Sequence, residues 1–354
     1  MKRDKDRMFC VCMILFSLLL CSCSPMSEVS ETENIEKSKL IGNCIGVVYT
    51  KTQKADTRIF VYDESGKKVT QKNYSMAMVG RFGFGIPQYR KGKMYEIAVG
   101  NDYKKNAGIV MCYDFYKNTV EEIEFDRINL VDLQVTEKNI YVISNISGMT
   151  YIDCYNLMNR KIETFVWKKG MVTDFAVSEN DEIYFATPDG EVYSVNMKEN
   201  KTSYICNIGE DIAYMYAIRQ KLYFSLSNAQ KGMLVVNPKN GKKHWLELDI
   251  HPVGQPFFNE GFLYVASNDP AGILSSTEIV KIKLENEKVT DRWKFDSDIH
   301  YFAVFGNVLY TLSWLEQKVR IYDMENSTLL LKKEIDVSVD DKDYKLSSMG
   351  IGIN

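Results

Sequence analysis

The 354-residue sequence predicts an all-β fold, a seven-bladed β-propeller built from four-stranded blades. Two observations carry this prediction. A unit of 39 to 46 residues recurs seven times from residue 44 onward, and no stretch shows the 3.6-residue periodicity of an amphipathic helix. The high numbers of tyrosine, 22 residues, and phenylalanine, 17 residues, also favour strands.

An aliphatic residue followed by tyrosine marks each repeat. The seven pairs are Val48-Tyr49, Met94-Tyr95, Ile140-Tyr141, Ile183-Tyr184, Leu222-Tyr223, Leu263-Tyr264 and Leu309-Tyr310. A short inner strand precedes nearly every pair, so we expect the pair itself to lie in the second strand of its blade. The third strand then ends near an Asp or Asn, as in CYDFYKNT from Cys112, whose side chain can cap the turn into the fourth strand.

The two ends of the repeat region complement each other. The first repeat opens directly on its second strand, IGVVYT, and has no inner strand before it. The segment KLSSMGIGIN, Lys345–Asn354, looks like an inner strand that lacks a second strand after it. We therefore expect this C-terminal strand to close the first blade, which hides both edges and makes residues 40–354 one domain.

The N-terminal residues 1–22 have the pattern of a signal peptide. The charged run MKRDKDR is followed by 13 almost wholly apolar residues, too few to span a hydrocarbon core of about 30 Å. The sequence Leu20-Cys21-Ser22-Cys23 resembles the lipobox of bacterial lipoproteins, and this resemblance implies cleavage before Cys23 and a lipid on its sulfur. An ordinary secretory signal is the alternative.

Residues 23–39 are rich in Ser, Glu and Lys, and this composition predicts a flexible tether behind the lipidated cysteine. The expected location is the extracytoplasmic face of a bacterial membrane, with the lipid on Cys23 as the membrane contact, because acyl chains supply the anchoring energy.

Charge and rare residues exclude several classes of protein. Lys and Arg number 44 against 47 Asp and Glu, for a net charge of −3, so a nucleic-acid partner is not expected. Only three histidines occur, which disfavours a His-rich metal site, and no metal is expected. Four cysteines follow the lipobox without a CxxC pair and are expected to be buried thiols: Cys44, Cys112, Cys154 and Cys206.

The aliphatic-Tyr pairs and the Asp or Asn turns resemble those of the quinoprotein-like and YVTN-type propellers of bacterial envelope proteins, over nearly all of residues 44–354. The resemblance implies the architecture and little about activity. The chain lacks the adjacent cysteine pair and the regular tryptophan motif of quinone-dependent dehydrogenases, so we expect no cofactor. It also lacks the WD dipeptide of WD40 repeats.

Aligning the inner strands on the following tyrosine gives one candidate position per blade near the channel mouth. These positions are Ile86, Asp132, Asp174, Tyr214, Gln255, Tyr301 and Ser348, with Arg81 and His300 close by in sequence. Carboxylates, phenols and an amide around one channel would suit a sugar, a peptide or a cation, whereas a wet channel without a ligand is the alternative. Asp132 and Asp174 fall in neighbouring blades and could serve acid–base chemistry or bind Ca²⁺.

These features favour a lipid-anchored binding or scaffold module without catalytic activity. Its partner would be an envelope protein or a polar ligand that the sequence does not identify. The alternative function is an enzyme at the channel mouth, a lyase or hydrolase acting on a small polar substrate.

Overall fold

The computed structural model describes residues 43–51, 54–77, 79–80, 87–98, 100, 108–209, 212–227, 231–268, 276–325 and 327–352. These residues lie within the compact unit Ser38–Asn354. The predicted signal peptide, Cys23, the tether, and the candidate residues Arg81 and Ile86 lie outside the described residues. Across the described part of the chain, no helix has the length and apolar character needed to cross a membrane.

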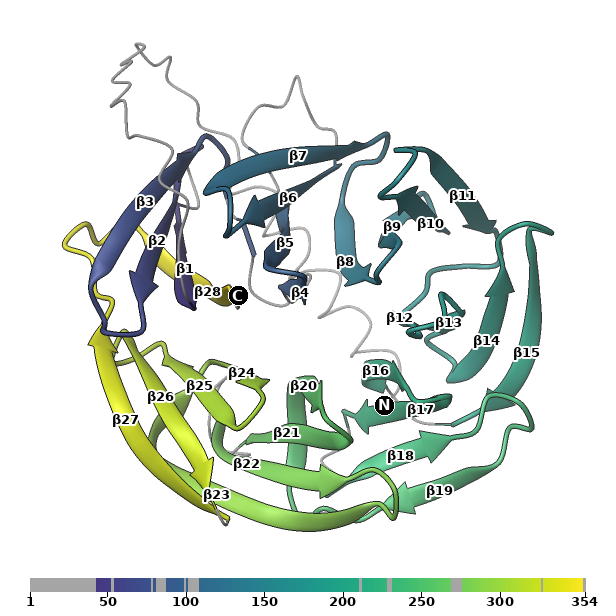
Figure 1. The fold of residues 1–354 in the computed structure, drawn as a ribbon. Helices are drawn as coiled ribbons and strands as arrows, with labels where there is room; N and C mark the ends of the chain where they lie inside the picture. Colours follow the sequence, from purple (N-terminus) through teal and green to yellow (C-terminus); the bar gives the residue numbers. More distant parts are fainter. Residues whose placement is uncertain are drawn as a thin grey trace, which may run out of the picture. The chain divides into compact units, whose positions relative to one another are not determined.

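Seven antiparallel four-stranded sheets form a ring, which confirms the predicted seven-bladed β-propeller (Figure 1). From the inner to the outer strand, blade 1 contains β28 (Lys345–Gly352), β1 (Cys44–Thr50), β2 (Thr57–Asp63) and β3 (Lys68–Tyr74); blade 2 contains β4 (Gln88–Arg90), β5 (Lys93–Ala98), β6 (Gly108–Asp114) and β7 (Thr119–Phe125); and blade 3 contains β8 (Leu130–Val135), β9 (Asn139–Ile146), β10 (Met149–Asn156) and β11 (Ile162–Trp167).

The remaining four blades have the same order. Blade 4 contains β12 (Asp174–Val177), β13 (Ile183–Ala186), β14 (Glu191–Asn196) and β15 (Lys201–Asn207); blade 5 contains β16 (Ile212–Ile218), β17 (Lys221–Leu226), β18 (Met233–Val236) and β19 (Lys243–Leu246); blade 6 contains β20 (His251–Asn259), β21 (Phe262–Asn268), β22 (Ser276–Lys283) and β23 (Lys288–Ile299); and blade 7 contains β24 (Tyr301–Phe305), β25 (Val308–Ser313), β26 (Lys318–Glu325) and β27 (Thr328–Asp336).

The aliphatic-Tyr pairs lie in the second strands, as predicted, and both members of every pair are buried. In blades 2 to 7 the tyrosine packs toward the following blade and the aliphatic residue toward the preceding one, because neighbouring strand residues point to opposite faces. Tyr95 of blade 2, for example, shares a cluster with Ile140 of blade 3, and Tyr141 with Ile183 of blade 4. The pair is therefore the unit that joins one blade to the next.

Blade 1 is an exception that the sequence repeat does not reveal. Val48 packs with Met94 of blade 2, whereas Tyr49 packs with Tyr310 of blade 7, so the two faces are exchanged relative to the other blades. In β1 the residue opposite Tyr62 is Ile45, just as Met94 lies opposite Tyr113 in blade 2, whereas Val48 lies opposite Ile59. Val48-Tyr49 therefore lies three positions further along its strand than the other pairs, and an odd offset turns the side chains to the opposite faces, so equating it with the other six pairs was wrong.

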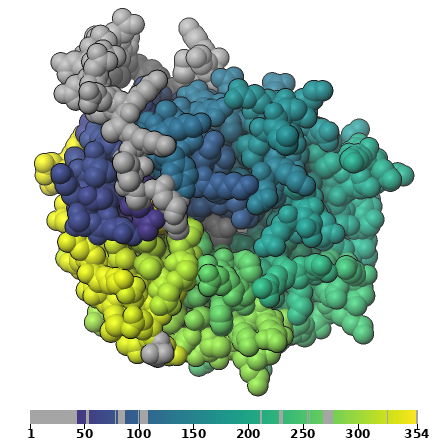
Figure 2. Space-filling view, viewed as in Figure 1, coloured from purple at the N-terminus to yellow at the C-terminus, as the bar shows by residue number. Residues whose placement is uncertain are grey.

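The predicted closure of the first blade is confirmed. β28 pairs antiparallel with β1 from Cys44 opposite Gly352 to Thr50 opposite Lys345, and Figure 1 shows β28 beside β1. In the space-filling view, the yellow C-terminal part of the chain lies against the dark blue residues of blade 1 (Figure 2). Leu346, Met349 and Ile351 are buried between blades 1 and 7. These contacts supply the apolar burial that holds the ring closed.

The third-to-fourth strand turns use the capping predicted from the sequence. The Asp114 Oδ1 atom accepts a hydrogen bond from the Lys117 backbone N–H at 3.0 Å, and Asn196 Oδ1 accepts one from Glu199 N–H at 3.1 Å. All four described cysteines are free thiols, and Cys154 alone among them is partly exposed. The expectation of four buried thiols is therefore correct for Cys44, Cys112 and Cys206 and wrong for Cys154.

Candidate functional site

Several predicted mouth residues come from the inner strands that surround the axis of the ring. Asp132 is the third residue of β8, Asp174 the first of β12, and Tyr301 the first of β24. Tyr214 is the third residue of β16. Gln255 lies in β20, but its side chain is not among those described.

Asp132 and Asp174 lie close enough for each charge to affect the other. Asp132 Oδ1 accepts the Leu133 N–H at 2.7 Å, and Asp174 Oδ1 accepts the Phe175 N–H at 2.9 Å. Asp174 Oδ2 also accepts the N–H of Met215 in blade 5 at 2.6 Å, which fixes its carboxylate between two blades. Burial raises the pKa of both carboxyl groups, and the charge of Asp132 raises the pKa of Asp174 further.

Two tyrosines of β16 adjoin this carboxylate pair. Tyr214 and Tyr216 lie two residues apart, so they project from the same face of the strand, with ring centroids 6.3 Å apart and an interplanar angle of 20°. The Tyr216 hydroxyl donates to the Gly254 carbonyl of blade 6 at 2.6 Å. Burial, followed by the charge of Asp174, raises the pKa of both phenols, so both stay neutral.

No described cation pairs with Asp132 or Asp174. The described residues also contain no group of three or more His, Cys, Asp or Glu side chains that could hold a metal ion. The pair therefore combines two carboxylates and two aromatic rings without a positive charge of its own. This arrangement can accept a cationic group or share a proton.

A second polar group lies between blades 1 and 2. Ser348, one of the predicted positions, donates a hydrogen bond to Oε1 of Glu96, which is 0% exposed. The Glu96 Oε2 atom is buried and has no hydrogen-bond partner among the described residues. Burial raises the pKa of this carboxyl to about 7, although the Ser348 hydrogen bond opposes the shift. Gly80 adjoins it with a φ of 64°, and a Cβ there would lie 2.9 Å from Glu96 Oε2.

Tyr301 belongs to the neighbourhood of this second group. Its ring meets Tyr89 edge to face with the centroids 6.2 Å apart, and the Tyr89 hydroxyl donates to the Met349 carbonyl of β28. Burial raises the pKa of both phenols, and the Glu96 charge contributes to each shift. Tyr301 thus lies with the blade-closing strand rather than with the aspartate pair.

His300 has a structural environment. Its ring packs against Trp314 with the centroids 5.8 Å apart, and it is hydrogen-bonded to the Ser347 backbone. Burial lowers its pKa, which keeps the imidazole neutral near pH 7. The described contacts of His300 are therefore those of a packed side chain in blades 7 and 1.

Sequence reasoning missed Glu96, Tyr89 and Tyr216. A signal for Glu96 was present, because a carboxylate interrupts the apolar run that follows Lys93 in the second strand KMYEIA. Tyr216 was missed because only one position per inner strand was aligned, although residues i and i+2 share a face. Tyr89 gave no distinguishing signal, since tyrosine is frequent throughout the repeats.

No protein-family model and no curated protein sequence matches the chain. Several solved structures share its fold. A putative 6-phosphogluconolactonase from Bacteroides uniformis has a TM-score of 0.57 at 8% identity, covering 88% of this chain and 100% of that one. Apo AztD from Citrobacter koseri has a TM-score of 0.55 at 10% identity, covering 88% of this chain and 98% of that one.

The dihydro-heme d1 dehydrogenase NirN, in complex with DHE, is also similar. Its TM-score is 0.54 at 14% identity, with 88% of this chain and 67% of that chain covered. At such identities the three likenesses establish the propeller fold and nothing about activity.

Proposed function

We propose that the protein is a lipid-anchored extracytoplasmic propeller that binds a polar ligand through a cationic group, without catalysing a reaction. The observation that carries this proposal is the buried pair Asp132 and Asp174, which has no described cationic partner. The solved structure of NirN, which shares this fold, is a complex with DHE, so a propeller of this kind occurs in a protein that binds a ligand. The lipobox around Cys23 supports the anchor and the compartment.

The electrostatics of the pair favour a cation. Two carboxylates held close together in a poorly solvated site cannot both be charged without a large free-energy cost. A protonated amine would remove that cost by pairing with both carboxylates. The ring faces of Tyr214 and Tyr216 can add a cation–π contribution of about 0.5–2 kcal/mol. The ligand class is therefore a polar molecule that carries an amine.

Calorimetric titration of the full chain in detergent with ethylammonium, putrescine and lysine tests this proposal. We expect at least one amine to bind and Asp132→Asn or Asp174→Asn to weaken binding at least about tenfold. The exposed Asp126→Asn serves as the matched control and should bind normally. If none of the amines binds, or if the substitutions at the pair have no effect, the channel is not a cation site.

The anchor is tested separately by Cys23→Ala. Because the lipid would be attached to the Cys23 sulfur, we expect this variant to remain an unprocessed precursor or to be released from membranes. Membrane fractionation with metabolic labelling by a fatty acid measures both outcomes. A variant that still fractionates as a mature membrane protein would contradict lipidation at Cys23.

A second candidate function is an enzyme, a lyase or hydrolase acting on a small polar substrate. The specific observation in its favour is again the aspartate pair, since a carboxyl and a carboxylate side by side can act as acid and base. Turnover of a defined substrate by the purified protein, lost in Asp132→Asn, would favour the enzyme over the binding module.

A further inference from the structure

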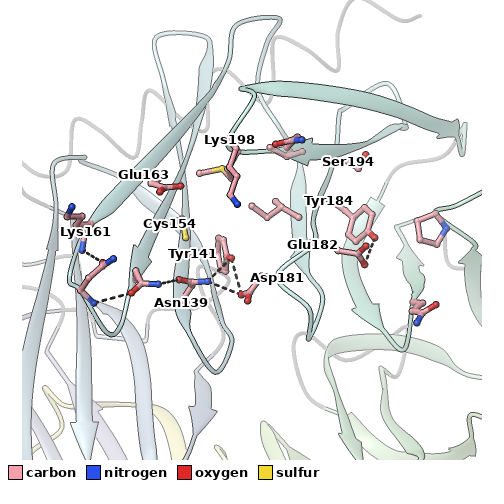
Figure 3. Close-up of a pocket in the computed structure, with 18 of the residues that line it drawn as sticks. Asn139, Tyr141, Cys154, Lys161, Glu163, Asp181, Glu182, Tyr184, Ser194 and Lys198 are labelled. Atoms are coloured by element: carbon pink, nitrogen blue, oxygen red, sulfur yellow. Dashed lines mark hydrogen bonds between the residues drawn. The ribbon is translucent and has the colours of Figure 1, made fainter.

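A pocket of about 640 Å³ lies where the turns of blades 3, 4 and 5 meet (Figure 3). Its size falls within the range of about 300–1,000 Å³ that is typical of small-molecule sites. Asp181 lines it and follows the end of β12, whereas Asp174 begins that strand. The pocket therefore lies at the opposite end of the blades from the aspartate pair and is independent of the function proposed above.

Asp181 is held firmly at the edge of this pocket. Its Oδ1 atom accepts hydrogen bonds from Thr136 Oγ1 at 2.6 Å, Tyr141 OH at 3.0 Å and Asn139 Nδ2 at 3.1 Å. Its Oδ2 atom has no hydrogen-bond partner among the described residues. Three donors on one oxygen fix the orientation of the carboxylate, so the second oxygen can accept a ligand hydrogen bond with little loss of side-chain entropy.

Lys198 supplies a donor in the same pocket. Figure 3 shows its side chain extending into the pocket from the β14–β15 turn, toward the side on which Tyr141 and Asp181 lie. No described carboxylate forms an ion pair with Lys198. A free ammonium donor and a fixed carboxylate acceptor therefore line the same space.

A hydroxyl group matches this arrangement, because it accepts one hydrogen bond while it donates another. Ile183, Val195 and Met197 add apolar surface to the lining between the polar groups. Alternating donors and acceptors beside an apolar patch complement a molecule that carries hydroxyl groups on a hydrocarbon ring. By contrast, an amine group would bind only to the Asp181 carboxylate, and a carboxylate group only to the Lys198 ammonium.

The charge of the lining points to an uncharged ligand. The pocket lining contains equal numbers of basic and acidic side chains. The basic ones are Lys161, Lys198 and Lys239, and the acidic ones are Glu163, Asp181 and Glu182. Glu182 is further held by the Tyr184 hydroxyl, which donates to its Oε2 atom at 3.1 Å. We propose that this pocket binds a neutral oligosaccharide, with one sugar hydroxyl bridging Asp181 Oδ2 and Lys198 Nζ.

Calorimetric titration of the full chain in detergent with maltotetraose, cellotetraose, mannotetraose and chitotetraose tests this proposal, and tetraalanine represents the peptide alternative. We expect at least one tetrasaccharide to bind with a dissociation constant of about 1 mM or lower, and Asp181→Asn and Lys198→Met each to weaken binding at least about tenfold. Asp181→Asn keeps an acceptor for the three donors and replaces the free oxygen by an amide donor.

Two control substitutions make the result specific. Lys201→Met, which removes an exposed lysine outside the pocket lining, and Asp132→Asn, at the other end of the blades, should both leave oligosaccharide binding unchanged. Should a pocket variant fail to fold, hydrogen exchange of the wild-type chain provides a second test. The bound sugar should then slow exchange in the turns at 156–161 and 196–200. Binding of tetraalanine alone, no binding of any tetrasaccharide, or protection elsewhere would overturn the proposal.

Discussion

Replacing Glu96 by glutamine should change how the stability of the propeller depends on pH. The carboxyl is 0% exposed, and one of its oxygens has no hydrogen-bond partner in the described part of the chain, so its charged form is poorly solvated in the folded protein. Its pKa rises from 4.5 to about 7 on folding. At about 1.4 kcal/mol per pH unit, this shift corresponds to about 3 kcal/mol.

The sign follows from the direction of the shift. Below pH 4.5 the carboxyl is protonated in both the folded and the unfolded chain, so it adds no pH-dependent penalty. As the pH rises toward 7, the unfolded chain loses the proton first, and the folded state becomes less stable by about 3 kcal/mol. Glutamine keeps the shape of the side chain and has no proton to lose, so Glu96→Gln should gain about that much relative to wild type between pH 4.5 and pH 8.

Urea unfolding, followed by tryptophan fluorescence at several pH values, measures this difference. Titration of the other acidic groups is common to both proteins and cancels when wild type is compared with the variant. The exposed Glu163→Gln is the matched control and should show no such trend. A stability difference between Glu96→Gln and wild type that is constant from pH 4.5 to pH 8 would refute the reasoning.

Three further outcomes are expected. Deleting Lys345–Asn354 removes three buried apolar side chains, each of which contributes about 1.5–3 kcal/mol to stability. Because a domain typically has a free energy of unfolding of about 5–15 kcal/mol, the truncated protein should melt at a much lower temperature. A melting temperature equal to that of the full chain would contradict the role of closure. Gly46→Ala places a Cβ 2.7 Å from the Phe115 ring and should lower the free energy of unfolding, measured in urea, by about 1–3 kcal/mol. An unchanged unfolding midpoint would show that the Phe115 ring moves aside without cost. Among the four described thiols, the partly exposed Cys154 should react first with an alkylating reagent in the native state, as read by mass spectrometry, and faster labelling of Cys112 would contradict this.

The blades were predictable because each depends on signals only a few residues long. An aliphatic-Tyr pair recurs in every unit and an Asp or Asn turn in most of them, and closure followed from one missing strand at each end. The reversed orientation of Val48 and Tyr49 was not predictable, because the hairpins between second and third strands differ in length, so the sequence pattern does not fix which residue of β1 lies opposite Tyr62.

The candidate sites were only partly accessible from sequence. Asp132 and Asp174 could be paired because neighbouring blades place equivalent positions side by side. The pairing of Glu96 with Ser348 joins strands about 250 residues apart, and the pocket near Asp181 is assembled from turns of three blades. Neither the Glu96–Ser348 pair nor the pocket produces a recognisable sequence motif, because residues that are neighbours in the ring need not be regularly spaced along the chain.

The pairing of β1 with β28 also sets an order of assembly. β1 emerges early in synthesis, but the strand that completes its sheet follows about 300 residues later. Until then, one edge of β1 has free N–H and C=O groups, and the cluster between blades 1 and 7 is unfilled. Ring closure is thus a contact of very high sequence separation, which folding theory associates with slow formation. A chain that stops before β28 keeps one edge of β1 open, and an open strand edge is a place where a second chain can pair and start aggregation.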